Sequence, residues 1–287
     1  MDHCGGRRQL LEDRDGPLRL QRETWKMPGD GILDSYERTP YAAGSHWETH
    51  PDSMAGVAAI LGIASPEVRG CRVLEIGCAT GGNMLPPAVV LPGAKFVGID
   101  LSPRQIEMAR RVAEALELSN VELHALDLMD FPADAGQFGY VICHGVYSWV
   151  PEPVRRKIVE LCARHLSPRG IAYISFNTYP GWHLRGIARD MMAFHAGRFE
   201  TPQQKITEAR RMMAIAAEAV SDRDSLFAKI VADEAREIVD QLDYYVLHEH
   251  LDEINRPFHF HEFERQLEEY GLTYLSESPL GSSAWGR

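Results

Sequence analysis

The sequence of 287 residues carries a formal net charge of -11 at pH 7, and 45% of its residues are hydrophobic. This length and composition allow one sizeable globular core with a small additional layer of helices. Because an acidic surface repels phosphate backbones, the charge argues against DNA or RNA as a partner.

The N-terminal residues and the cysteines bear on the cellular compartment. We expect residues 1–33 to form a flexible extension, and the first 26 residues contain no apolar run of the length of a signal peptide or membrane anchor. The five cysteines form no C-x-x-C pair, which argues against a disulfide framework and a structural zinc site. The expectation is a cytoplasmic protein with reduced thiols, without a metal and without membrane association.

From about residue 72 to residue 179, short runs rich in Val and Ile alternate with helix-like segments. This alternation is typical of a parallel sheet covered by helices. It predicts an α/β fold with a doubly wound, mainly parallel, Rossmann-like sheet. The expected strands are residues 72–76, 95–99, 121–125, 139–143 and 171–176.

Capping signals mark the helices around this sheet. Residues 103–116 should form a helix with Ser102 as its N-cap and Gln105 completing a capping box. The next residues after Leu85 are two prolines, which only a first helical turn accommodates, so the helix after the first strand should begin near Leu85. Another helix should cover residues 152–165 and end at a turn formed by Ser167 to Gly170.

The strand signal disappears between about residues 203 and 247, where the sequence predicts two helices. The alternation of helix and strand then returns, with a predicted helix at 258–270 and a predicted sixth strand at 272–277. A helical insertion after the fifth strand would lie over the carboxyl ends of the strands, where it could act as a lid or substrate platform. The expected parts are a core at 34–195, a helical insertion at 196–256, and the last helix and strand of the core at 257–287.

A glycine turn follows the first strand, and an acidic residue ends the second. At Gly77 or Gly81 a Cβ would occupy space that a cofactor needs at the end of a parallel strand. Asp100 follows Gly77 by 23 residues, close to the spacing of a carboxylate that bridges ribose hydroxyls. Alone, this pattern fits both a nicotinamide dinucleotide and S-adenosylmethionine.

The spacing inside the turn separates these two cofactors. Gly77-x-x-x-Gly81-Gly82 differs from the G-x-G-x-x-G turn that cradles a pyrophosphate at a helix N-terminus. S-adenosylmethionine has no phosphate and needs no such site. Asp127, just past the third strand, is placed to accept a hydrogen bond from an adenine amino group, or to cap a helix. The pattern favours S-adenosylmethionine, with a nicotinamide enzyme as an alternative.

Four motifs carry a resemblance to a known family: GCATGGN at 77–83, VGIDLSPRQ at 97–105, HGVYSWV at 144–150 and NTYPGWH at 177–183. They resemble class I S-adenosylmethionine-dependent methyltransferases, and within them bacterial proteins whose methyltransferase domain is followed by a methyltransferase regulatory domain. Rickettsial lysine methyltransferases that act on outer-membrane protein belong to that group. The cofactor-binding residues, with those the resemblance implies, are Glu75, Gly77, Cys78, Gly81, Asn83, Asp100, Leu101, Asp127, Leu128 and His144.

The resemblance covers about residues 36–277 and also shows a departure. Proteins of this group usually continue well past this chain's end, and a class I sheet normally closes with a seventh, antiparallel strand. Residues 281–287 are too short and too rich in small residues to form it. We therefore expect the core to be truncated.

Aromatic residues follow the fourth and fifth strands, at the edge where a methyl group would lie. A slot lined by aromatic side chains lowers the pKa of a lysine ammonium, because it removes water from around the charge. Aromatic faces also attract cations. With the resemblance, this predicts protein-lysine N-methylation by in-line transfer. The alternatives are a small-molecule methyltransferase of secondary metabolism and a non-catalytic cofactor-binding protein, and packing is the competing role for each side chain. The predicted catalytic residues are His144, Tyr147, Tyr179, Trp182 and His183.

Overall fold

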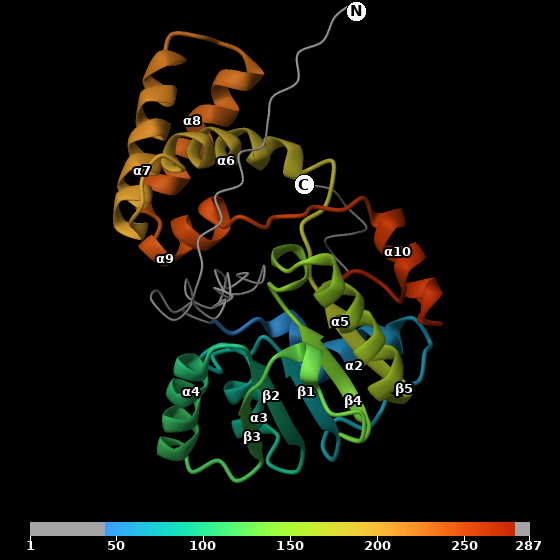
Figure 1. Ribbon diagram of the computed structural model, residues 1–287. Coiled ribbons are helices and arrows are strands. Elements are labelled where there is room, and N and C mark those ends of the chain that lie inside the picture. The colour runs from blue at the N-terminus through green and yellow to red at the C-terminus, as the bar shows by residue number, and fades with distance from the viewer. Residues whose placement is uncertain (1–43, 279–287) are drawn as a thin grey trace, which may run out of the picture.

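The computed structural model describes residues 44–278, so the predicted extension at 1–33 and the chain end at 279–287 lie outside the described residues. Its core is a sheet of five parallel strands in the order β3-β2-β1-β4-β5 (Figure 1). The strand order reverses beside β1, which makes the carboxyl ends of β1 and β4 the usual ligand-binding position. This confirms the predicted fold class. The strands are β1 (Arg72–Ile76), β2 (Lys95–Asp100), β3 (Val121–Ala125), β4 (Phe138–Cys143) and β5 (Leu166–Ile174).

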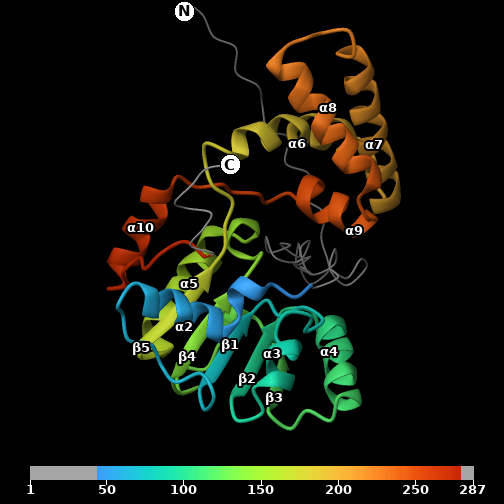
Figure 2. The ribbon, with the colours of Figure 1, turned by 180° about the vertical axis from the view of Figure 1, so that it is seen from behind.

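Helices cover both faces of the sheet, and the alternation of side chains along β1 divides the core between them. Val73 packs with α2, α3 and α4 on one face, whereas Leu74 packs with α5 and α10 on the other. Figures 1 and 2 show these two layers from opposite sides. The helices are α2 (Pro51–Ile60), α3 (Leu85–Val90), α4 (Pro103–Ala115), α5 (Glu152–His165) and α10 (Phe260–Glu269).

The helices begin where the capping signals predict, but one predicted capping box lacks its second hydrogen bond. Helix α3 begins at Leu85, and Ser102 accepts a hydrogen bond from the backbone N–H of Gln105 at 3.2 Å. The Gln105 side chain is buried, and its Oε1 has no partner within residues 44–278. The predicted capping box is therefore only half formed, because the Gln105 side chain packs inward and does not return to the N-cap.

Strand β5 is longer and less regular than predicted. The turn expected at 167–170 lies inside it as a bulge, since Leu166 pairs with Phe138 and Ile171 pairs with Tyr140. Four residues of β5 thus lie opposite Gly139 alone, and the strand stays in the sheet on both sides of them. The strand ends at Ile174, two residues earlier than expected, because the chain then leaves towards the helical region.

The sixth strand predicted at 272–277 is wrong for the described part of the chain, where this segment joins no sheet. Tyr270 is the C-cap of α10, and Gly271, the predicted C-cap, follows it with a φ of +72°. Leu272 and Tyr274 then pack against the core on the α5 side. The alternating apolar side chains of this segment pack against the core, and the segment pairs with no neighbouring strand of the described chain.

The remaining helices form a separate unit with its own apolar cluster, which includes Met192, Met213 and Ile238. We call it the helical unit. It begins at Trp182, earlier than the boundary predicted at 196, because α6 packs with α7 and α8. No helix within residues 44–278 has the length and apolar character of a membrane span. The helical unit comprises α6 (Trp182–Ala196), α7 (Pro202–Ala219), α8 (Leu226–Asp240), α9 (Asp243–Tyr245) and the π-helix η4 (Val246–Leu251).

Two linkers, the outgoing linker at 175–181 and the returning linker at 252–259, join the helical unit to the sheet on the side of the strands' carboxyl ends (Figures 1 and 2). They run side by side, with a parallel bridge between Thr178 and Phe258. The outgoing linker also contacts the turn after β4, where Asn177 N–H donates to Ser148 Oγ at 2.8 Å. Arg256 N–H on the returning linker donates to the Ser148 carbonyl at the same distance. The helical unit is therefore tied to the carboxyl edge of the sheet.

Candidate functional site

The glycine turn after β1 is held against β2. The backbone N–H groups of Gly77 and Cys78 both donate to the Ile99 carbonyl, at 2.8 and 3.0 Å. Gly77 and Gly81 have φ values of +71° and +79°, which favour glycine. A Cβ on Gly77 would lie 2.5 Å from Val146 Cγ2. Both positions thus require glycine, although at Gly77 a neighbouring protein side chain, and not the space for a cofactor, is the nearest obstacle.

Asp100 ends β2 next to this turn, and its carboxylate is fixed by two backbone groups. Oδ2 accepts the N–H of Ala79 at 2.9 Å, and Oδ1 accepts the N–H of Ser102 at 2.9 Å. A carboxylate accepts hydrogen bonds, and these two backbone bonds hold it beside the glycine turn. The two hydroxyls of a ribose are suitable donors, so the geometry fits the predicted ribose contact.

A buried polar pair lies between β1 and the end of the turn. Asn83 Nδ2 donates to Glu75 Oε1 at 2.7 Å, and the second carboxylate oxygen, Oε2, is buried with no partner in the described chain. Burial raises the pKa of Glu75 to about 8, although the Asn83 hydrogen bond opposes this shift. On its other side, Asn83 Oδ1 accepts hydrogen bonds from His46 N–H at 2.9 Å and Thr49 Oγ1 at 3.1 Å.

His144 joins the same contacts from the end of β4. Its ring centroid lies 3.8 Å from that of His46 and 5.9 Å from that of Tyr173 on β5. Burial, followed by the His46 charge, lowers the pKa of His144 to about 4, so its ring is uncharged near neutral pH. Its Nδ1 atom is buried and lacks a hydrogen-bond partner among residues 44–278.

These orphaned atoms test whether the site suits S-adenosylmethionine. A buried polar atom without a partner costs about 1 to 3 kcal/mol, and a bound polar ligand can remove that cost. Glu75 Oε2 and His144 Nδ1 are two such atoms, and they are linked through Asn83 and His46. With the Asp100 carboxylate nearby on β2, this polar set fits a ligand that brings a ribose and an amino acid group.

The other predicted cofactor residues differ in their surroundings. Asp127 accepts the N–H of Met129 at 2.9 Å and caps the short helix η2 (Leu128–Asp130), so its capping role is confirmed and its adenine contact stays a prediction. Leu101 is partly exposed at the end of β2. Cys78 and Leu128 are buried in the core, and burial raises the pKa of the Cys78 thiol well above its ordinary value.

Tyr147 was predicted to be catalytic, but the structure places it in the core. Its side chain is fully buried among aromatic rings, including Phe258 and Phe263. Its hydroxyl donates to Gln266 on α10, and burial raises its pKa far above the ordinary value. The ring packs because the turn after β4 directs it inward, while His144 at the start of that turn contacts His46.

Tyr179, Trp182 and His183 form a second group, on the outgoing linker and the first turn of α6. Tyr179 stacks on His183 with centroids 4.2 Å apart and lies 5.1 Å from His259 of the returning linker. Trp182 lies 5.9 Å from the guanidinium of Arg185. These contacts do not join the group to His144 or Asp100, so its role in catalysis stays a prediction.

Three residues of the site had no individual prediction from the sequence. His46 and Thr49 precede α2, and Tyr173 lies on β5; their contacts with Asn83 and His144 come from distant parts of the chain. A capping signal at His50 before Pro51 marks the start of α2, but nothing in the local pattern directs His46 towards β4.

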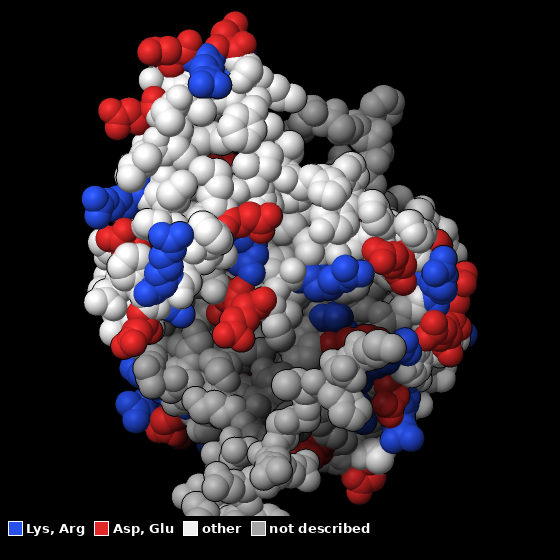
Figure 3. All heavy atoms as spheres, turned by 45° about the horizontal axis from the view of Figure 1, so that its top comes forward, with Lys and Arg blue, Asp and Glu red and all other residues white. Residues whose placement is uncertain are grey.

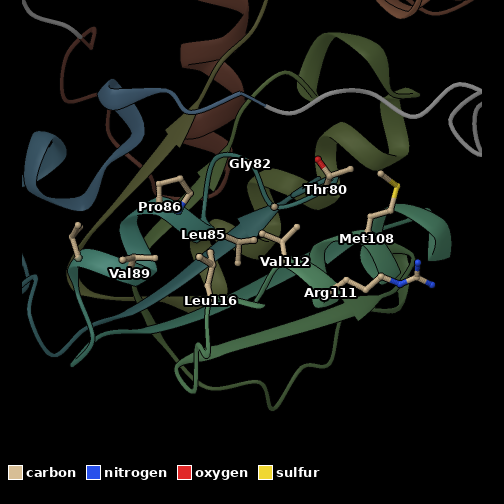
Figure 4. Close-up of a pocket in the computed structure, with 11 residues that line it drawn as sticks. Thr80, Gly82, Leu85, Pro86, Val89, Met108, Arg111, Val112 and Leu116 are labelled. Carbon is tan, nitrogen blue, oxygen red and sulfur yellow. The ribbon is translucent and has the colours of Figure 1, made fainter. Parts of the chain in front are cut away.

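An apolar groove lies behind the glycine turn, between α3 and α4 (Figure 4). Val89 from α3 and Val112 from α4 face it, and both are about half exposed. The lining contains Thr80, Gly81 and Gly82 of the turn but neither Asp100 nor His144. Asp100 and His144 thus lie outside this groove. Within residues 44–278, no group of three or more His, Cys, Asp or Glu side chains is arranged to hold a metal ion.

Comparison with known proteins agrees with this geometry. A methyltransferase domain model matches residues 73–170, and a model described as a predicted methyltransferase regulatory domain matches residues 242–284. Two uncharacterized proteins of Rickettsia prowazekii are similar. RP789 is 39% identical over 88% of this chain, which covers 45% of RP789. RP028 is 36% identical over 80% of this chain, which covers 92% of RP028.

A solved structure extends the similarity to the fold. PKMT2 from Rickettsia typhi in complex with AdoHcy superimposes with a TM-score of 0.76 and 36% identity, over 83% of this chain and 46% of PKMT2. The chain thus spans about half the length of RP789 and of PKMT2. The chain belongs to the class I S-adenosylmethionine-dependent methyltransferases, in the subgroup that carries a methyltransferase regulatory domain.

Proposed function

We propose that this chain transfers a methyl group from S-adenosylmethionine to the side-chain nitrogen of a lysine in a protein. The observation that carries the proposal is the similarity to PKMT2, a chain bound to AdoHcy and 36% identical over 83% of this sequence. The motif resemblance to lysine methyltransferases points to the same acceptor. AdoHcy is the form that the methyl donor takes after transfer.

Methyl transfer from a sulfonium depends chiefly on position. The donor supplies an electrophilic methyl carbon, and the lone pair of the acceptor nitrogen forms the new N–C bond as the S–C bond breaks. The residues of this chain therefore have to orient both partners and exclude water. Asp100 would hold the ribose, and the Glu75–Asn83 pair would contact the amino acid end of the donor.

A lysine acceptor must be neutral before it can attack. Its ordinary pKa is about 10.4, so its ammonium first loses a proton to water. A carboxylate beside the nitrogen would favour the charged form, whereas an uncharged imidazole accepts an N–H without favouring that form. His144 is uncharged near neutral pH and has an unpartnered Nδ1, so it suits the task of orienting the amine. Tyr179, Trp182 and His183 are proposed to contact the acceptor side chain.

The acidic charge of the protein would favour a basic substrate segment. The net charge is -11, and the stretch 233–253 on the helical unit is rich in carboxylates. Several carboxylates there are already paired, such as Glu237 with Arg185 and Asp243 with Arg210. Figure 3 shows acidic and basic side chains interspersed on one face of the molecule. The attraction would therefore come from the overall charge and would weaken at high salt.

Methyl-labelled S-adenosylmethionine tests the proposal. We would incubate it with the protein and either a cell proteome or a metabolite extract, followed by hydrolysis and mass spectrometry of labelled amino acids. Methyllysine in the proteome arm is the expected result. Label only in the metabolite arm would show a small-molecule methyltransferase, and tight cofactor binding without label in either arm would show a non-catalytic binding protein. Asp100→Ala provides the control for label that does not depend on the site.

A further inference from the structure

Residues 46–50 form a short segment before α2, which we call the strap; it includes the 3-10 turn η1 (Trp47–Thr49). In Figures 1 and 2 the strap, in blue, runs between the sheet and the helical unit. Its hydrogen bonds to Asn83 fix it to the end of the glycine turn. Thr49 is buried, so this attachment is shielded from water. The strap is thus held firmly at the carboxyl edge of the sheet, next to the glycine turn.

From this anchored position the strap reaches the end of β4. The His46 backbone N–H bonds Asn83 at 2.9 Å while the His46 ring lies against the ring of His144, at 3.8 Å between centroids and a tilt of 34°. One residue therefore bonds the turn with its backbone and packs on His144 with its side chain. These contacts connect the Glu75–Asn83 pair to the strap and the strap to His144 in one continuous series.

We propose that His46 is a positioning residue that holds His144 against the acceptor nitrogen during methyl transfer. This inference rests on the proposed function, because His144 orients an acceptor only if the chain transfers methyl groups to an amine. His46 itself is not assigned a contact with the cofactor or the acceptor. His46 acts by keeping the His144 ring in one orientation and by shielding that ring from water.

The charges around His144 explain what the loss of His46 would change. His46 covers one side of the ring from the strap, and Tyr173 of β5 lies on another at 5.9 Å. Burial and the His46 charge lower the pKa of His144, while Glu48 on the strap raises it. Without the His46 ring, water reaches His144 and its pKa moves back towards the ordinary 6.5. A protonated ring would only donate hydrogen bonds and would repel a lysine ammonium.

Three variants of the full chain separate positioning from a structural effect. His46→Ala removes the ring, His46→Phe keeps a ring of similar shape against His144, and Trp47→Ala changes a neighbouring strap side chain that is 64% exposed. Each variant is examined by calorimetric titration with S-adenosylmethionine, by kcat and KM with a lysine peptide, and by NMR titration of the His144 ring.

We expect His46→Ala to lower kcat by about tenfold, a typical scale for lost positioning of one group. The KM for the cofactor should change by less than about twofold, since no contact of the His46 side chain with the cofactor is proposed. The midpoint of the His144 titration should rise from about 4 towards 6.5. His46→Phe should restore kcat and most of the fall in the midpoint, because the phenyl ring restores the burial of His144 but not the His46 charge. Trp47→Ala should match the parent protein.

An unchanged His144 titration in His46→Ala would overturn the inference, as would a kcat loss that His46→Phe fails to restore. A loss of cofactor affinity equal to the loss of kcat would assign the strap to cofactor binding alone and also contradict it. If the parent protein methylates no lysine, the proposed function fails. In that case, the NMR titration still reports whether His46 controls His144.

Discussion

The carboxylate of Asp100 accepts the backbone N–H of Ala79 at 2.9 Å, so the acid at the end of β2 is bonded directly to the glycine turn after β1. Ala79 has a φ of +47°, in the left-handed region. A second bond from Ser102 N–H holds the other carboxylate oxygen at 2.9 Å. These two backbone bonds hold the carboxylate in one orientation beside the glycine turn.

Replacing Asp100 with Ala should abolish detectable cofactor binding while leaving the chain folded. Loss of a charge-assisted hydrogen bond costs about 1.5 to 3 kcal/mol, and a ribose bridged by one carboxylate loses two such bonds. The dissociation constant should therefore rise by at least about a hundredfold. Calorimetric titration with S-adenosylmethionine measures the change, with the exposed Asp130→Ala as control. Equal affinities for Asp100→Ala and the parent would remove Asp100 from the site.

Gly77→Ala and Gly145→Ala form a matched pair that separates backbone strain from a side-chain clash. The φ values are +71° and +67°, so each substitution incurs left-handed strain of about 1 to 2 kcal/mol. Only the new Cβ at Gly77 meets Val146 Cγ2, at 2.5 Å, whereas the space around Gly145 is open. We expect Gly77→Ala to lower the free energy of unfolding by about 1 to 3 kcal/mol more than Gly145→Ala.

Urea denaturation measures both glycine variants. Adding Val146→Ala to Gly77→Ala should recover part of the extra loss, because the substitution removes the atom that clashes. Equal losses in the two single variants, or no coupling with Val146, would show that the turn relaxes to accept a Cβ.

Much of the sheet could be predicted because its local signals are strong. The bounds of β1 and β3 are those expected from their apolar runs, and α3 begins at Leu85 because prolines fit only a first helical turn. The segment 272–277 has the same alternation as a strand but packs on the core without a sheet partner. Alternation reports which side chains face the core, and strand pairing depends on a neighbour that local sequence does not reveal.

The candidate site could be predicted only where a motif places its residues together. Asp100 and the glycine turn follow from spacing along one βαβ unit. His46 and Tyr173 come from segments far from His144 in sequence, and their ring contacts depend on the tertiary fold. The buried position of Tyr147 could not be predicted, because a short 3-10 turn has no period that tells which of its side chains faces inward.

Tyr147→Phe should affect stability and leave methyl transfer unchanged. The ring stays in the aromatic core, and only the hydroxyl that donates to Gln266 is lost. We expect the free energy of unfolding to fall by about 1 kcal/mol, with kcat unchanged. The control is Tyr274→Phe, whose exposed hydroxyl bond to Glu277 should contribute less. A kcat loss of hundredfold or more at unchanged stability would return Tyr147 to the catalytic residues.

Glu75→Gln should change how stability depends on pH. Burial raises the pKa of Glu75 from its ordinary 4.5 to about 8, so between these values the folded protein keeps a proton that the unfolded chain has lost. The parent's free energy of unfolding therefore gains an unfavourable contribution from Glu75 as pH rises from 4.5 to 8. Glutamine cannot ionise, and its carbonyl can still accept the Asn83 hydrogen bond.

The advantage of Glu75→Gln over the parent should thus be smallest near pH 4.5, grow up to about pH 8 and level off above it. Urea denaturation without cofactor measures the difference at about pH 5, 6.5 and 8. The exposed Glu114→Gln on α4 controls for removal of one negative charge. A difference that stays constant over this range would show that Glu75 is ionised in the folded protein throughout, and its unpartnered oxygen would then need a cation as neighbour.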